Sequence, residues 1–181
     1  EILDEPGVAQ ALDVPANNLT TAGSVVNIVS RSINCPTSGY VMVFASAQVN
    51  IAHTNGTSST LDFGVSSTST TIDGDQDVDI GVSSAAPSGT YYIPGAAQKI
   101  YSVSAGTQTF YVLARKNSGN THIVSAVTLS LLFVPTAYGT VSTVVSAGEA
   151  SEFGQVLPLC LPLALHVESH LPGQEQGVAL V

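Results

Sequence analysis

The sequence predicts an all-β domain built from two antiparallel sheets packed as a sandwich, followed by an extended, strand-like C-terminal tail. Three observations predict this fold class. Hydrophobic residues recur at every second position through most of the 181-residue chain, which is the period of a strand. Gly- and Ser-rich turns separate these runs. No window combines an apolar stripe with the caps of a helix, and β-branched residues, Tyr and Phe fill the runs.

The first long strand is expected from Tyr40 to Ile51. Its odd-numbered positions are small or apolar throughout, and its even-numbered positions are apolar as far as Phe44, so we expect burial on both faces at its start. Asn55-Gly56 follows, a dipeptide that readily takes the positive φ angles of a tight hairpin turn. The chain should therefore reverse there into a strand that carries Leu61, Phe63 and Val65.

Shorter strands follow, and turn signals separate them. They are expected at Val78–Val82, near Tyr91–Ile93, at Lys99–Val103 and at Thr109–Ala114, with turns at 104–107 and 117–120. The last long strand should run from His122 to Val134 and end at Pro135. Strands of this number, with turns at intervals of roughly 8–12 residues, indicate a two-sheet sandwich or jelly roll. The strand order does not follow from the pattern.

One domain is enough for a chain of this length. We divide it into an N-terminal extended segment at 1–24, a β-sandwich domain at 25–146, and an acidic linker with a leucine-alternating tail at 147–181. Within the sandwich, Asp62-Phe63-Gly64-Val65-Ser66-Ser67 and Asp79-Ile80-Gly81-Val82-Ser83-Ser84 form a near repeat, which indicates that two strands end in a similar way.

Three stretches of the predicted sandwich are similar to those of a known family. They are Ser38–Phe44 with its Gly-Tyr pair, Ala105–Ala114 and Leu129–Phe133. Together they resemble the C1q and tumour-necrosis-factor-like jelly rolls over about residues 25–145. The resemblance implies a jelly-roll sandwich, trimeric assembly and a surface that binds a ligand. The chain departs from the family in its few aromatic residues and its lack of Trp.

The tail carries a row of apolar side chains at strand spacing, which we call the leucine row: Leu157, Leu159, Leu161, Leu163, Leu165 and Val167. Pro158 and Pro162 exclude a helix interior and a central strand, so an edge-type segment is expected. Such a row needs a surface to cover it. It could cover its own sandwich, with Cys35 and Cys160 as a candidate disulfide, or insert into a neighbouring subunit by strand addition. A foreign segment from Glu152 onward is the third alternative.

The charge balance limits the partners. The net charge is −9, and only 9% of residues are charged. Four scattered Lys and Arg residues cannot build a surface for nucleic acid or for an anionic membrane. Hydroxyls and amides must solvate most of the surface, as in exported wall, fibre or capsid-like proteins. The sequence begins at Glu1 without a basic, apolar leader, as expected if a secretion signal has been removed, so we expect an extracellular or cell-surface location.

One concentration of charge is a candidate metal site. Asp73, Asp75, Asp77 and Asp79 alternate in a loop that enters a strand. Carboxylate oxygens are the ligands that Ca²⁺ prefers, whereas a solvated acidic loop is the alternative. No other cofactor is predicted.

Catalysis has no support in the sequence. The G-x-S-x-G elbow is absent, and neither His53 nor His122 has an identifiable partner that would orient it as a base. Two functions therefore compete. The first is a secreted structural subunit that associates with itself into a fibre or surface assembly through sandwich edges and tail exchange. The second is a trimeric recognition module for a glycan or a protein, with Ca²⁺ as a candidate cofactor.

Overall fold

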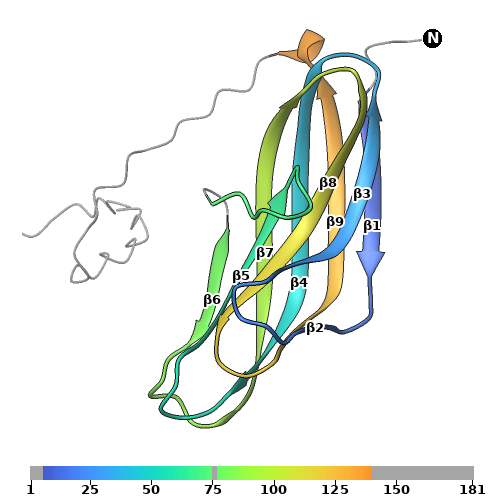
Figure 1. Cartoon of the computed structure of the whole chain (residues 1–181). Helices are drawn as coiled ribbons and strands as arrows, with labels where there is room; N and C mark the ends of the chain where they lie inside the picture. The colour runs from blue at the N-terminus through green and yellow to red at the C-terminus, as the bar shows by residue number, and fades with distance from the viewer. Residues whose placement is uncertain (1–5, 75–76, 140–181) are drawn as a thin grey trace, which may run out of the picture. The chain divides into compact units, whose positions relative to one another are not determined.

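The computed structural model describes residues 6–74 and 77–139, and these form the predicted all-β sandwich of two antiparallel sheets (Figure 1). The strands are β1 (Gly7–Asp13), β2 (Asn17–Leu19), β3 (Val25–Cys35), β4 (Gly39–His53), β5 (Ser59–Ser66), β6 (Val78–Val82), β7 (Gly89–Val103), β8 (Gly106–Ser118) and β9 (His122–Pro135). A 3-10 turn, η1 (Thr136–Tyr138), follows β9. It is the one helical element of the described residues, and no helix there is long and apolar enough to cross a membrane.

The strand order is that of a jelly roll. One sheet runs β1-β9-β4-β7, with the short β2 paired to β9, and the other runs β3-β8-β5-β6. When β2 is set aside and the eight remaining strands are numbered along the chain, the orders read 1-8-3-6 and 2-7-4-5, the two interlocked Greek keys of this fold. This order is common to jelly rolls in general, so it does not single out the C1q and tumour-necrosis-factor-like family.

The core lies between the sheets and follows the predicted alternation. Alternate residues of β4 point inward, and Val41, Val43, Val49 and Ile51 are completely buried. Leu61, Phe63 and Val65 of β5 meet them from the other sheet. The start of β4 is not buried on both faces as expected, because Phe44 is 43% exposed on the outside of its sheet. The apolar start of β4 therefore belongs to a surface.

The connection at Asn55-Gly56 differs from a hairpin. Gly56 has the expected positive φ of 92°, and the chain does reverse. However, β4 pairs with β7 and β9, whereas β5 pairs with β6 and β8, so the turn carries the chain from one sheet to the other. The turn residues predict a change of direction, and the pairing depends on contacts made by strands much later in the chain.

Two further differences extend the sheet of β4. β7 is one continuous strand that includes Pro94, where two separate strands were expected. Proline has no N–H to donate to a neighbouring strand. Because β7 is an edge strand, its open side has no such neighbour, and Pro94 is tolerated there. In addition, β1 and β2 lie within 1–24, the range expected to be an extended segment, and both pair with β9 as part of the sandwich.

Candidate functional site

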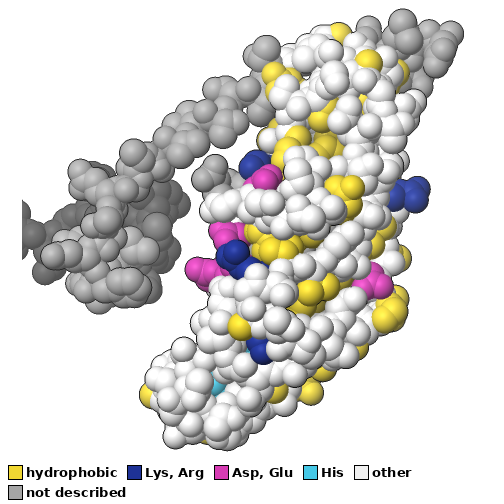
Figure 2. Space-filling model, viewed as in Figure 1, with side chains coloured by type: hydrophobic (Ala, Val, Ile, Leu, Met, Phe, Trp, Pro, Cys, Tyr) yellow, Lys and Arg dark blue, Asp and Glu magenta, His cyan; other side chains and the backbone are white. Residues whose placement is uncertain are grey.

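The outer face of the β3-β8-β5-β6 sheet carries a cluster of charged side chains, which Figure 2 shows gathered on the side toward the viewer. At its centre is Asp62 of β5, which is 2% exposed. On the neighbouring strand β8, the Arg115 Nε donates to Asp62 Oδ2 at 2.8 Å, the Arg115 Nη2 bonds the same oxygen, and the Asn117 amide donates to Oδ1. The buried carboxylate is thus paired and hydrogen-bonded on both oxygens.

A second carboxylate faces Asp62 from β6. Asp62 and Asp79 are directly opposite each other in the antiparallel pair, which places the two aspartates of the near repeat side by side. Burial alone would raise the pKa of Asp62, but hydrogen bonds from Asp79, Arg115 and Asn117 and the Arg115 charge hold that pKa below its usual range. The hydrogen bond to Asp62 and the negative charge of Asp62 raise the pKa of Asp79.

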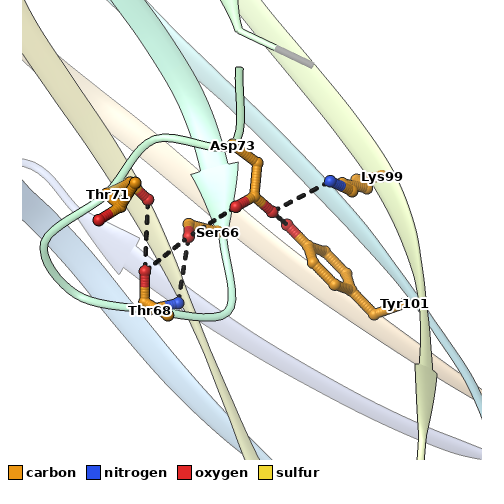
Figure 3. Close-up of polar contacts among 6 residues, drawn as sticks. All are labelled: Ser66, Thr68, Thr71, Asp73, Lys99 and Tyr101. Atoms are coloured by element: carbon orange, nitrogen blue, oxygen red, sulfur yellow. Dashed lines mark hydrogen bonds and ion pairs between the residues drawn. The ribbon is translucent and has the colours of Figure 1, made fainter. Parts of the chain in front are cut away.

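The loop after β5 connects the two sheets through Asp73 (Figure 3). Asp73 Oδ2 accepts hydrogen bonds from Lys99 Nζ at 3.1 Å and from the Tyr101 hydroxyl at 2.8 Å, both on β7, while the Ser66 hydroxyl on β5 donates to Oδ1 at 3.4 Å. Burial of its ring and the neighbouring Asp73 carboxylate raise the pKa of Tyr101. Asp73 therefore holds the loop against an edge of each sheet.

The same loop covers part of the charged sheet face. Ile72 and Leu113, 9% and 0% exposed, are buried but do not belong to the core between the sheets. A Cβ built on Gly64 would lie 2.8 Å from the Ile72 Cγ2, so glycine is needed for the loop to approach β5 this closely. The loop thus has an apolar contact and a polar contact with the sandwich.

The structure divides the four aspartates of the predicted calcium site. Asp73 is engaged by Lys99 and Tyr101, and Asp75 lies outside the described residues. Asp77 and Asp79 instead gather with Asp62, and one carboxylate oxygen from each lies within 4.8 Å of the others. Asp62 was not among the predicted ligands; its place in the near repeat was the available signal. Binding of Ca²⁺ stays a prediction.

The outer face of the β1-β9-β4-β7 sheet is different, because the outward side chains that these four strands contribute within the described residues are all uncharged. Its cross-strand pairing sets Val8, Leu132, Met42 and Ile100 side by side in one row across four strands. Val8 is 78% exposed and Ile100 42% exposed. The remaining outward residues are polar but uncharged, or apolar: Gln10, Leu12, Tyr40, Phe44, Ser46, Gln48, Asn50, Ala52, Thr90, Tyr92, Pro94, Ala96, Gln98, Ser102, Ile123, Ser125, Ala126, Thr128, Ser130 and Val134. We call this surface the uncharged face.

Neither described histidine faces solvent. His53 Nδ1 lies 3.0 Å from the Ser59 Oγ, and its Nε2 lies 3.2 Å from the Ala86 carbonyl oxygen. The pair resembles a nucleophile and its base, but His53 and Ser59 are 4% and 1% exposed, so a substrate cannot reach the hydroxyl. His122 is completely buried, and burial lowers its pKa. These contacts stabilise the sandwich at one end.

Several predicted residues lie outside the described residues. They are the whole leucine row, Leu157, Leu159, Leu161, Leu163, Leu165 and Val167, together with Cys160. Cys35 is 1% exposed, and burial raises the pKa of its thiol. Both the disulfide and the docking of the row remain predictions.

No family model and no curated protein match the sequence. Among solved structures, the chain is similar to the infectious bursal disease virus Gx strain (TM-score 0.40) and to the VP2 subviral particle of that virus (0.41). Each likeness has 10% identity and covers 75% of this chain and 34% of the other. The chain thus spans about a third of the length of those proteins.

Proposed function

We propose that this chain is a non-enzymatic structural subunit that associates with itself through the uncharged face. The observation that carries the proposal is the continuous apolar row from Val8 to Ile100 on a sheet face to which the described strands contribute no outward Lys, Arg, Asp or Glu. Exposed apolar surface of this kind is typical of sites where proteins associate.

The distribution of charge supports a second copy as the partner. The chain has a net charge of −9, so two copies repel each other at long range. Of the five described carboxylates, only Asp13, at the end of β1, belongs to the sheet of the uncharged face. Asp62 and Asp79 lie on the other sheet, Asp77 gathers with them just before β6, and Asp73 is in the loop between β5 and β6. Contact through the uncharged face therefore keeps these carboxylates apart. Each apolar side chain removed from water would contribute roughly 1.5–3 kcal/mol.

Two other properties support parts of the proposal. The buried His53–Ser59 pair and the buried His122 leave the described histidines unsuited to catalysis, which supports a non-enzymatic role. The low share of charged residues, 9%, supports the further proposal that the subunit works at an extracellular or cell-surface location.

Light scattering coupled to gel filtration tests the function over a range of protein concentrations. We expect a mass above that of the monomer that grows with concentration. Ile100→Glu should weaken association by about tenfold or more, because a carboxylate would lose its water at the interface. Ser30→Glu adds the same charge to an exposed position of the other sheet and should have no such effect. A monomer at all concentrations would overturn the proposal, and a closed trimer would favour the recognition module over an open assembly.

A further inference from the structure

The sheet that contains β5 and β8 has a gap at one end. β8 pairs with β3 along Gly106–Arg115, but its pairing with β5 begins at Tyr111. The reason is that β5 ends at Ser66, where the chain leaves the sheet for the loop described above. Among the described residues, 106–110 of β8 therefore have a strand partner on one side only. Unpaired backbone groups at such an edge are a template for another strand.

A cleft of about 350 Å³ lies at this gap. Its walls come from both sheets: Ser67, residues 101–103 of β7 and residues 108–111 of β8. β7 is the edge strand of its own sheet, so the cleft opens between two strand edges. Phe110 is buried at its base, and its ring lies 4.9 Å from that of Tyr101. None of the lining residues is charged, so the cleft suits an uncharged segment with apolar side chains.

We propose that this cleft accepts the leucine row of a second copy as an added strand along residues 106–110 of β8. The inference rests on the proposed function, since it assumes that copies associate, and it names a second contact between them. The length of the chain allows it. Leu157 follows Gly139, the last described residue, by 18 positions, which can span roughly 60 Å when extended. A row of one copy can therefore reach a neighbouring sandwich.

The spacing of the prolines matches this role. In an added strand, alternate residues direct both N–H and C=O toward the acceptor, and the others direct them away. Pro158 and Pro162 occupy the same alternate set, and all six members of the leucine row occupy the other. The row can therefore bond β8 through its own N–H groups while both prolines face away, as prolines in edge strands do. Residues 155–165 are also uncharged, like the cleft.

Binding of a labelled synthetic peptide of residues 155–168 tests the inference by fluorescence anisotropy. The acceptor is the full chain with Leu161→Ser and Leu163→Ser, so that its own row competes less. We expect saturable binding. N-methylation of Leu161 removes one N–H directed at β8 and should weaken binding by about tenfold, the effect of one buried hydrogen bond. N-methylation of Ala164, in the set that faces away, is the matched control and should change affinity less than about twofold.

A variant of the acceptor locates the site. Gln108→Trp fills the cleft and should abolish peptide binding, whereas Asn34→Trp, at an exposed position of β3, should not. No binding, equal effects of the two N-methylations, or unchanged binding to Gln108→Trp would each overturn the inference. Such a result would leave the proposed function standing if the chain still associates and Ile100→Glu still weakens that association. Peptide binding to a chain that remains monomeric at all concentrations would instead overturn the proposed function and the assignment of the donor to a second copy.

Discussion

Replacement of Arg115 by Met should destabilise the sandwich strongly at neutral pH. Asp62 is 2% exposed and keeps its charge through Arg115 and Asn117, so the substitution leaves a buried carboxylate with one amide donor and the Asp79 carboxyl beside it. Breaking a buried ion pair costs about 3–5 kcal/mol. Because the Arg115 side chain is 39% exposed, solvent screens part of the interaction, and we expect about 2–3 kcal/mol.

This loss can be measured by urea unfolding followed by circular dichroism, and in thermal melts it corresponds to roughly 5–10 °C. The pH dependence identifies the cause. The folded-state pKa of Asp62 is lowered, so its stabilisation is present above the ordinary value of 3.8 and is lost as the pH falls through the lower folded value. The deficit of Arg115→Met should therefore be complete at pH 7 and should shrink below pH 3.8.

A double-mutant cycle supplies the control. Asp62→Asn removes the buried charge, so Asp62→Asn with Arg115→Met should be more stable than Arg115→Met alone. Additive losses, or a deficit for Arg115→Met below about 0.5 kcal/mol, would refute the reasoning, because either result would mean that the pair is not coupled.

Three more substitutions test other parts of the charged face and the core. Gly64→Ala places a Cβ 2.8 Å from Ile72 and should cost about 1–3 kcal/mol in urea unfolding, whereas Gly74→Ala, where a Cβ meets nothing within 4 Å, should cost far less. Asp79→Asn should raise the melting temperature at pH 7 by removing a carboxyl whose pKa is raised by its neighbour, and the gain should vanish in acid below that pKa. Because burial lowers the pKa of His122, the unfolded chain binds a proton more readily than the fold once the pH falls below the ordinary value of 6.5, and the fold loses stability there. His122→Gln should therefore flatten the melting temperature between pH 7 and 5, and an unchanged slope would contradict this.

Most strands could be predicted from the sequence, because a strand with one buried face alternates apolar and polar residues within its own short segment. β4 and β9 were expected within two residues of their ends, and β6 matches its expected range. The pattern could not separate a buried second face from an exposed apolar one, and Phe44 is the example. Pro94 interrupted the pattern of β7 although an edge strand tolerates it.

The candidate site could be predicted far less well, because it depends on pairing between distant strands. Asp62 and Arg115 are 53 residues apart and meet only because β5 lies beside β8. The uncharged face likewise joins four strands that are far apart in the sequence. The run of acidic residues predicted Asp73 as a calcium ligand. The run alone could not show that Lys99 and Tyr101, on a distant strand, donate hydrogen bonds to the Asp73 carboxylate.

Site-directed cross-linking tests the central claim most directly. Phe44 lies within the uncharged face and is 43% exposed, whereas Cys35 is 1% exposed and should not react. In a Cys160→Ser chain, Phe44→Cys treated with a short bifunctional maleimide should give covalent dimers at concentrations where the protein associates, and Ser30→Cys on the other sheet should not. Equal cross-linking at both positions, or association without cross-links at Phe44→Cys, would contradict the claim that copies meet through the uncharged face.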